Sequence, residues 1–150
     1  MKKVKYAVII LNYNTVQDCC IAIESIRKTA TCRDYIICIV DSGSTIEDEK
    51  EGLKKLEAED VELLLLDNNI GYAKGNNEGI KYLLHKYDFQ YTVIMNPDVV
   101  IEKSGTIDGL IEELRSSRSI SKEDADILVD ALSTILDDLN RGTLEIDMEA

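Results

Sequence analysis

The sequence predicts an open α/β fold in which a mainly parallel, Rossmann-like sheet carries helices on both faces. Four apolar runs of strand length, 6–11, 35–40, 61–66 and 91–95, alternate with segments of helical periodicity. The runs are apolar throughout rather than alternately polar, which is typical of parallel strands that are buried on both faces. Right-handed crossovers between such strands would bring all four carboxyl ends to one edge of the sheet.

Three helices are predicted between the four runs. Thr15, with Asp18 three residues later, resembles a capping box and predicts that the first helix begins there. A polar helix is expected at 47–58, and a third helix is expected at 73–86. The buried face of the first helix is predicted to contain Val16, Cys19, Cys20, Ile23, Ile26 and Ala30.

Beyond the fourth run the pattern becomes helical. A short strand is expected at 99–101, and a pair of amphipathic helices follows, one at 107–114 and a longer one at 121–141. Two domains are therefore predicted. Residues 1–101 would form the α/β core, and residues 102–150 would form an acidic helical extension. The extension is expected to pack on the core, or at an interface in a homodimer or with a partner subunit.

Composition restricts the kinds of partner. The formal net charge is −12, which argues against nucleic acid because a phosphate backbone requires a basic surface. No apolar run approaches the roughly 20 residues that span a bilayer, and the N-terminus lacks a signal-peptide cleavage pattern. The four cysteines form no CxxC pair, so they are expected to be reduced thiols. These features favour a cytoplasmic protein.

Each apolar run ends in a polar, turn-forming cluster. The clusters occupy residues 12–14, 41–44, 67–71 and 96–98. Because ligands bind at the carboxyl ends of the strands in open α/β sheets, four clusters at these ends describe one site. We expect this site to hold a nucleotide diphosphate and a divalent metal ion.

Two carboxylates in these clusters are candidate ligand contacts. Asp41 directly follows the second run and could accept hydrogen bonds from a base N–H or a ribose hydroxyl; alternatively, its cluster is only a turn before the next helix. Asp98 follows Asn96 and Pro97. One carboxylate together with phosphate oxygens and waters would suit Mg²⁺ or Mn²⁺. The alternative here is an ordinary Asn-Pro-Asp turn.

Glycines are spaced four residues apart at Gly71, Gly75 and Gly79. On a helix they would form one bare face, and the loop before them could offer N–H groups to an anion at the helix N-terminus. Tight packing of the helix on the sheet is the alternative explanation. Asn76 and Asn77 lie near the start of this helix, where asparagines are costly unless they have hydrogen-bond partners.

Taken together, these stretches resemble a known family. Over roughly residues 5–101 the chain resembles the inverting family 2 glycosyltransferases of the GT-A fold, in their rhamnosyltransferase-like branch. The matching stretches are VIILNYNT (8–15), IVDSGST (39–45), NNIGYAKGNNEGI (68–80) and IMNPDVVI (94–101).

The resemblance implies a role for single residues. Asp98 stands at the family's DxD position and would hold Mg²⁺ or Mn²⁺, which assists departure of the diphosphate. The donor would be a UDP- or dTDP-sugar. The residues that would bind this donor are Asn12, Tyr13, Asn14, Asp41, Gly71, Asn76, Asn77 and Asn96.

The implied activity is inverting transfer of a sugar to an acceptor hydroxyl. Family members continue past the DxD position into an acceptor-binding half that supplies a base, an Asp or Glu, and the stretch from Ser121 onward does not match that half. No catalytic base is therefore assigned. The alternative function is a truncated, non-catalytic module that binds a nucleotide sugar or another protein.

Overall fold

The structure, a computed structural model, describes residues 1–117. Its main sheet has four parallel strands in the order β4-β3-β2-β6. This arrangement confirms the predicted fold and all four predicted strands. The strands are β2 (Tyr6–Asn12), β3 (Tyr35–Ser42), β4 (Val61–Leu66) and β6 (Tyr91–Met95).

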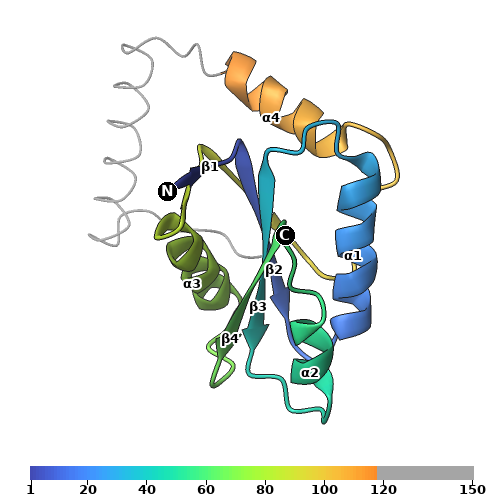
Figure 1. Cartoon of the computed structure of the whole chain (residues 1–150), viewed down its shortest axis with the longest axis vertical. Helices are drawn as coiled ribbons and strands as arrows, with labels where there is room; N and C mark the ends of the chain where they lie inside the picture. The colour runs from blue at the N-terminus through green and yellow to red at the C-terminus, as the bar shows by residue number, and fades with distance from the viewer. Residues whose placement is uncertain (118–150) are drawn as a thin grey trace, which may run out of the picture. The chain divides into compact units, whose positions relative to one another are not determined.

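Helices cover both faces of the sheet, as the sequence predicts (Figure 1). Helices α1 (Val16–Thr29) and α2 (Glu49–Lys54) lie on one face, and α3 (Tyr72–Leu84) lies on the other. Each face buries its own apolar cluster, because successive side chains of a strand point to opposite faces. In β2, Tyr6 and Val8 join the cluster beneath α1, whereas Ala7 joins the cluster beneath α3.

The last described helix, α4 (Thr106–Ser117), confirms the helix predicted at 107–114. Its buried residues Ile107 and Ile111 belong to the cluster beneath α1. Met1–Ile111 forms one compact unit, and a second unit begins at Glu112. The domain boundary expected at residue 101 stays a prediction. The predicted helix at 121–141 lies outside the described residues.

Two local predictions are wrong. No strand forms at 99–101; instead the Ile101 N–H donates to Ser25 Oγ at 3.0 Å, and the Ile101 side chain packs against the cluster beneath α1. Helix α1 does begin where predicted, with Thr15 as its N-cap residue, but the capping box is absent because the Thr15 side chain makes no capping hydrogen bond. A buried carboxylate from α2 takes that role, because Glu49 Oε1 accepts a hydrogen bond from the Val16 N–H.

Helix α2 is shorter than the predicted span 47–58. Asp48 adopts a left-handed conformation with φ of 67°, which prevents the helix from extending toward the N-terminus. At the other end the N–H groups of Leu56 and Glu57 donate to carbonyls only three residues back, so the last turn tightens. Ala58 then pairs with Val61 in an isolated bridge.

A second, small sheet was not predicted. Strand β1 (Lys2–Lys3) pairs in parallel with β5 (Tyr87–Asp88), just before the amino ends of β2 and β6. Two residues are too few to produce a recognisable apolar run, so the sequence contains no signal for these strands.

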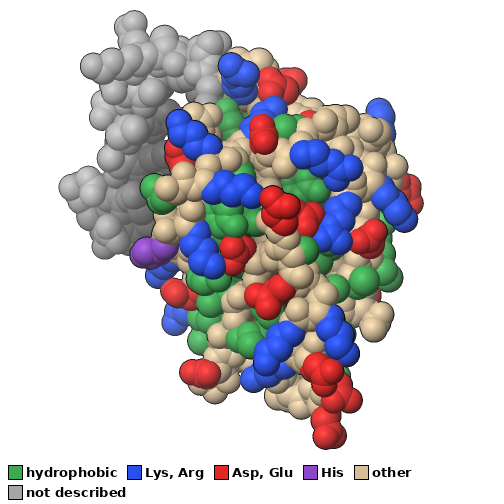
Figure 2. All heavy atoms as spheres, viewed as in Figure 1, with side chains coloured by type: hydrophobic (Ala, Val, Ile, Leu, Met, Phe, Trp, Pro, Cys, Tyr) green, Lys and Arg blue, Asp and Glu red, His purple; other side chains and the backbone are tan. Residues whose placement is uncertain are grey.

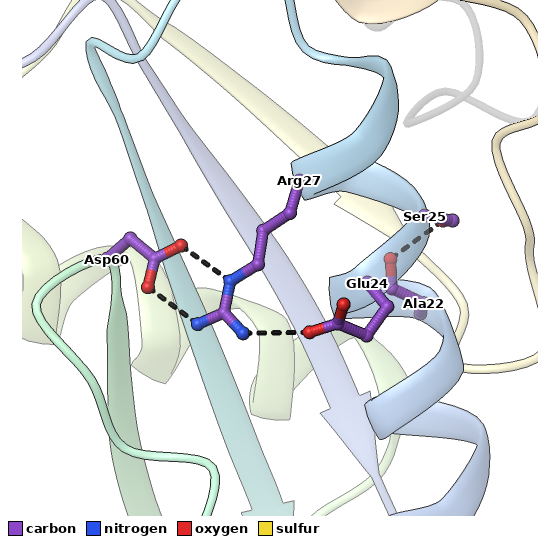
Figure 3. Close-up of polar contacts among 5 residues, drawn as sticks. All are labelled: Ala22, Glu24, Ser25, Arg27 and Asp60. Atoms are coloured by element: carbon purple, nitrogen blue, oxygen red, sulfur yellow. Dashed lines mark hydrogen bonds and ion pairs between the residues drawn. The ribbon is translucent and has the colours of Figure 1, made fainter.

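An ion pair ties α1 to the residue before β4. Arg27 Nε donates to Asp60 Oδ2 at 2.8 Å, and Nη2 donates to Oδ1 at 2.7 Å (Figure 3). Arg27 Nη1 also donates to Glu24 Oε1 at 3.0 Å, which holds the guanidinium from both sides (Figure 3). The hydrogen bonds from Arg27 lower the pKa of Asp60 below its usual value.

The surface is of mixed charge. On the face shown in Figure 2, lysine and arginine side chains are interspersed with aspartate and glutamate and form no continuous basic patch. Within residues 1–117, no helix has the length and apolarity to cross a bilayer.

All four cysteines are free, and burial raises the pKa of both Cys19 and Cys38 to about 12.

Candidate functional site

A cavity of about 460 Å³ opens where β2 and β6 end. Strand β2 has β3 on one side and β6 on the other, so the order of strands reverses at this point in the sheet. Such a switch point leaves a crevice at the carboxyl ends of the strands. We call it the strand-end cavity; it is lined by Leu11, Tyr13, Thr15, Asp18, Ser42, Asn69, Tyr72, Asn96, Pro97 and Asp98.

The four polar clusters do converge, as the sequence predicts. The strand-end cavity takes Tyr13 from the first cluster, Ser42 from the second, Asn69 from the third and Asp98 from the fourth. Of the predicted site residues, Tyr13, Asn96 and Asp98 line it. Those that do not line it are Asn12, Asn14, Asp41, Gly71, Asn76 and Asn77.

Asp41 is fully buried in a hydrogen-bond network that joins the ends of β2 and β3. Its Oδ1 accepts hydrogen bonds from Asn12 Nδ2 at 2.9 Å and from the Ser44 hydroxyl, and its Oδ2 accepts one from the Ser44 N–H at 3.2 Å. Asn12, also fully buried, uses its Oδ1 to accept the N–H of Thr15. In this structure Asp41 therefore holds the cavity wall, and a direct contact with a base stays a prediction.

Asn14 fixes the loop after β2 against the loop after β3. It adopts a left-handed conformation with φ of 58°, which asparagine tolerates better than most residues. Its Oδ1 accepts the N–H groups of Thr45 at 2.8 Å and Ile46 at 3.0 Å, and its own N–H donates to Ser44 Oγ. Asn14 thus keeps its neighbour Tyr13 at the edge of the cavity.

The loops after β3 and β4 also pack closely. A Cβ on Gly43, whose φ is +70°, would lie 2.8 Å from the Asn68 backbone, so only glycine fits. Asn69 Oδ1 accepts hydrogen bonds from Ser42 Oγ at 3.3 Å and from the Gly71 N–H at 3.0 Å. This amide links the end of β3 to the start of α3.

The glycines within α3 serve helix packing, which confirms the alternative explanation for two of the three. A Cβ on Gly75 would lie 2.6 Å from Leu11 Cδ1, and a Cβ on Gly79 would lie 2.5 Å from Val40 Cγ2. Gly71 differs, since a Cβ there would meet nothing within 4 Å, although its φ of +88° still favours glycine.

The two asparagines of α3 have different environments. Asn76 is only 2% exposed, and its Nδ2 donates to the Tyr72 carbonyl at 2.9 Å. Its buried Oδ1 has no partner among the described residues. Asn77 is exposed. Asn76 therefore stabilises the first turn of α3, which carries Tyr72 to the cavity.

Sequence reasoning missed several lining residues, and Tyr72 and Asp18 are the most informative. The Tyr72 hydroxyl donates to Asn96 Oδ1 at 3.0 Å and so joins α3 to the turn after β6. That turn is closed by a 3.2 Å hydrogen bond from the Val99 N–H to the Asn96 carbonyl. Tyr72 directly follows the predicted cluster at 67–71, and Asp18 lies in the first turn of α1, so only their positions near the strand ends offered a signal.

The donor atoms in the strand-end cavity suit a hard cation. They are carboxylate, hydroxyl and amide oxygens, with no histidine or cysteine among the lining residues. Within residues 1–117, no group of three or more His, Cys, Asp or Glu side chains could enclose a metal ion. A divalent ion would therefore have to share its coordination with a bound ligand, as Mg²⁺ does with substrate phosphates.

An open, parallel α/β sheet with a ligand-sized cavity at its switch point defines a Rossmann-like protein. The sequence comparison with family models specifies the class further. The chain matches the model of "Glycosyl transferase family 2" over residues 7–138 and belongs to that family. No curated protein matches the chain.

Solved structures show the same fold. The chain resembles the crystal structure of Staphylococcus aureus TarS 1–349, with a TM-score of 0.60 and 18% sequence identity over 75% of this chain and 33% of that chain. It resembles TarS 1–349 in complex with UDP equally well, with a TM-score of 0.60 and 21% identity over 73% of this chain and 32% of that one. The chain thus spans about a third of the length of these structures.

Proposed function

We propose that the strand-end cavity binds the nucleoside diphosphate of a UDP- or dTDP-sugar together with Mg²⁺ or Mn²⁺, for inverting transfer of the sugar to an acceptor hydroxyl. The observation that carries this proposal is that Asp98, Asn96 and Tyr13 line one cavity at the switch point of the sheet. Family membership and the UDP complex of TarS support it. The NPD motif favours a donor of the rhamnosyltransferase-like branch.

The charges in the cavity explain why a metal would be needed. Two carboxylates, Asp18 and Asp98, line it, and none of its described lining residues is lysine or arginine. A diphosphate would therefore be repelled unless a cation lies between it and the carboxylates. Asp98 would hold that ion, which would neutralise the charge that develops on the leaving diphosphate.

The chain's own residues would bind and orient the nucleotide. The exposed Tyr13 ring offers a stacking surface for a base, and the hydroxyls of Thr15 and Ser42 offer hydrogen bonds to ribose or phosphate. Asp41, Asn12 and Asn14 would keep these groups in place through the loop network. No described residue is assigned as the catalytic base.

Calorimetric titration of UDP, with and without Mn²⁺, tests the proposal. We expect Mn²⁺ to tighten UDP binding by at least about tenfold, and we expect Asp98→Ala to remove this dependence. Asp88→Ala, on β5 near the amino edge of the sheet, is the matched control and should behave like the wild type. Absence of UDP binding, or an Asp98→Ala variant with unchanged Mn²⁺ dependence, would contradict the proposal.

A further inference from the structure

We infer that Tyr72 is a positioning residue that turns the Asn96 side chain so that it offers a hydrogen-bond donor, and not a metal ligand, to the strand-end cavity. This inference rests on the proposed function. It assigns the two polar side chains of the Asn-Pro-Asp turn different tasks: Asp98 holds the metal ion, and Asn96 donates to a phosphate oxygen of the nucleotide.

The Asn96 amide has two chemically different ends. Its Oδ1 accepts a hydrogen bond from the Tyr72 hydroxyl at 3.0 Å, which engages one of the two lone pairs of the oxygen and orients the amide. Its Nδ2 lies on the opposite side of the amide group and donates to no residue in the described part of the chain. An NH₂ group has two donors and no lone pair for a metal ion, but it complements an anionic phosphate oxygen.

Tyr72 itself is held at both ends. The hydroxyl donates to Asn96, and the backbone carbonyl accepts a hydrogen bond from Asn76 Nδ2 at 2.9 Å. Asn76 is only 2% exposed and sits in the first turns of α3, so it anchors this end of the helix. The backbone of Tyr72 is therefore held by Asn76, and its hydroxyl is held by the hydrogen bond to Asn96.

The electrostatics of the cavity favour this division. A donor at Asn96 adds positive potential where Asp18 and Asp98 already place two negative charges. A hydrogen bond between a neutral donor and a charged acceptor is stronger than one between neutral groups. Tyr72 thus contributes to diphosphate affinity without touching the metal ion.

Four variants distinguish a donor from a ligand at position 96: Asn96→Ala, Tyr72→Phe, their combination, and Asp98→Ala. For each variant, the dissociation constant of UDP is measured at saturating Mn²⁺, and the dissociation constant of Mn²⁺ is measured at saturating UDP by electron paramagnetic resonance. Tyr82→Phe is the matched control. It removes a tyrosine hydroxyl from the same helix, where that hydroxyl donates to Glu62 at 3.0 Å and lines no part of the cavity.

We expect Asn96→Ala to weaken UDP binding about tenfold, in keeping with the loss of one hydrogen bond to a charged group, and to leave the Mn²⁺ constant within about twofold. Tyr72→Phe should weaken UDP binding about threefold in the wild-type background and have no further effect on Asn96→Ala. Asp98→Ala should raise the Mn²⁺ constant at least about tenfold, and Tyr82→Phe should change neither constant.

Two results would overturn the inference while leaving the proposed function intact. One is an Mn²⁺ constant that rises as much in Asn96→Ala as in Asp98→Ala, which would make Asn96 a metal ligand. The other is a dissociation constant of UDP in the double variant that rises by the product of the two single effects, which would show that Tyr72 and Asn96 act independently. A wild-type protein that binds no UDP would instead overturn the proposed function and this inference with it.

Discussion

The two aspartates at the carboxyl edge of the sheet have different environments. Asp41 is fully buried and its two oxygens accept three hydrogen bonds, whereas Asp98 borders the strand-end cavity. The sequence predicts that both aspartates lie at the carboxyl ends of strands. Their orientations could not, because the partners that bury Asp41 are Asn12, 29 positions away, and the turn residue Ser44.

Asp41→Asn should lower the free energy of unfolding by about 2 kcal/mol, because an amide offers one acceptor oxygen where the structure needs two and brings donors against donors. Denaturation in urea measures the effect. Asp67→Asn, an exposed position directly after β4, is the control and should change stability by less than about 0.5 kcal/mol. Equal effects of the two substitutions would show that the network contributes nothing to stability.

For helices and strands, apolar periodicity predicts which elements form, but tertiary contacts determine how their ends are capped and what packs against them. The four strands and the presence of four described helices follow from apolar periodicity. The start of α1 at Thr15 was also predicted, but the sequence does not show that the carboxylate bonded to its first N–H belongs to Glu49, which lies 33 residues away. The glycine spacing in α3 predicts a bare face, but only the packed sheet shows that Leu11 and Val40 fill it.

Gly79→Ala should destabilise the protein by about 1–2 kcal/mol, although alanine favours helix. The added Cβ would lie 2.5 Å from Val40 Cγ2 and 3.1 Å from Ile9 Cγ2, and both neighbours are fully buried. Gly109→Ala in α4 is the matched control, since a Cβ there meets nothing within 4 Å and should stabilise by about 0.5–1 kcal/mol. Stabilisation by both substitutions would contradict the packing described for α3.

The ion pair between α1 and the start of β4 should make stability depend on pH. The pKa of Asp60 is lowered in the folded protein, so its contribution is present above the unfolded pKa of about 4 and is lost as the pH falls through the folded value. Arg27→Gln should therefore cost about 1 kcal/mol at pH 7, a value kept small because solvent screens side chains that are 31% and 32% exposed.

Urea denaturation of wild type and Arg27→Gln at pH 7 and pH 3 measures this difference. It should shrink at pH 3, because below the unfolded pKa of about 4 the unfolded chain binds a proton at Asp60 more readily than the folded protein does. Lys55→Gln is the control, because Lys55 and Glu51 are 72% and 68% exposed and their pair should contribute less than about 0.5 kcal/mol. A difference for Arg27→Gln that is the same at both pH values would show that Asp60 does not carry the effect.

At the scale of the whole molecule, the fold brings residues from four separate stretches of the chain to one cavity. Right-handed crossovers between parallel strands bring their carboxyl ends to one edge of the sheet, which explains why the convergence of Tyr13, Asn96 and Asp98 was predictable although the order of the strands was not. The chain belongs to glycosyl transferase family 2 and spans about a third of the TarS chain. The described residues can therefore be tested directly for one proposed step of sugar transfer, which is the binding of the nucleotide-sugar donor at the carboxyl edge of the sheet.

Paramagnetic broadening in the NMR spectrum of the isotope-labelled protein, with UDP and substoichiometric Mn²⁺, tests that claim most directly. We expect the amide signals of Tyr13 and Asp98, at the carboxyl edge, to broaden strongly, and those of Tyr87 and Asp88, near the amino edge, to persist. Mg²⁺ in place of Mn²⁺ should leave all four signals sharp. Broadening centred on the amino edge, or no local broadening with UDP present, would contradict it.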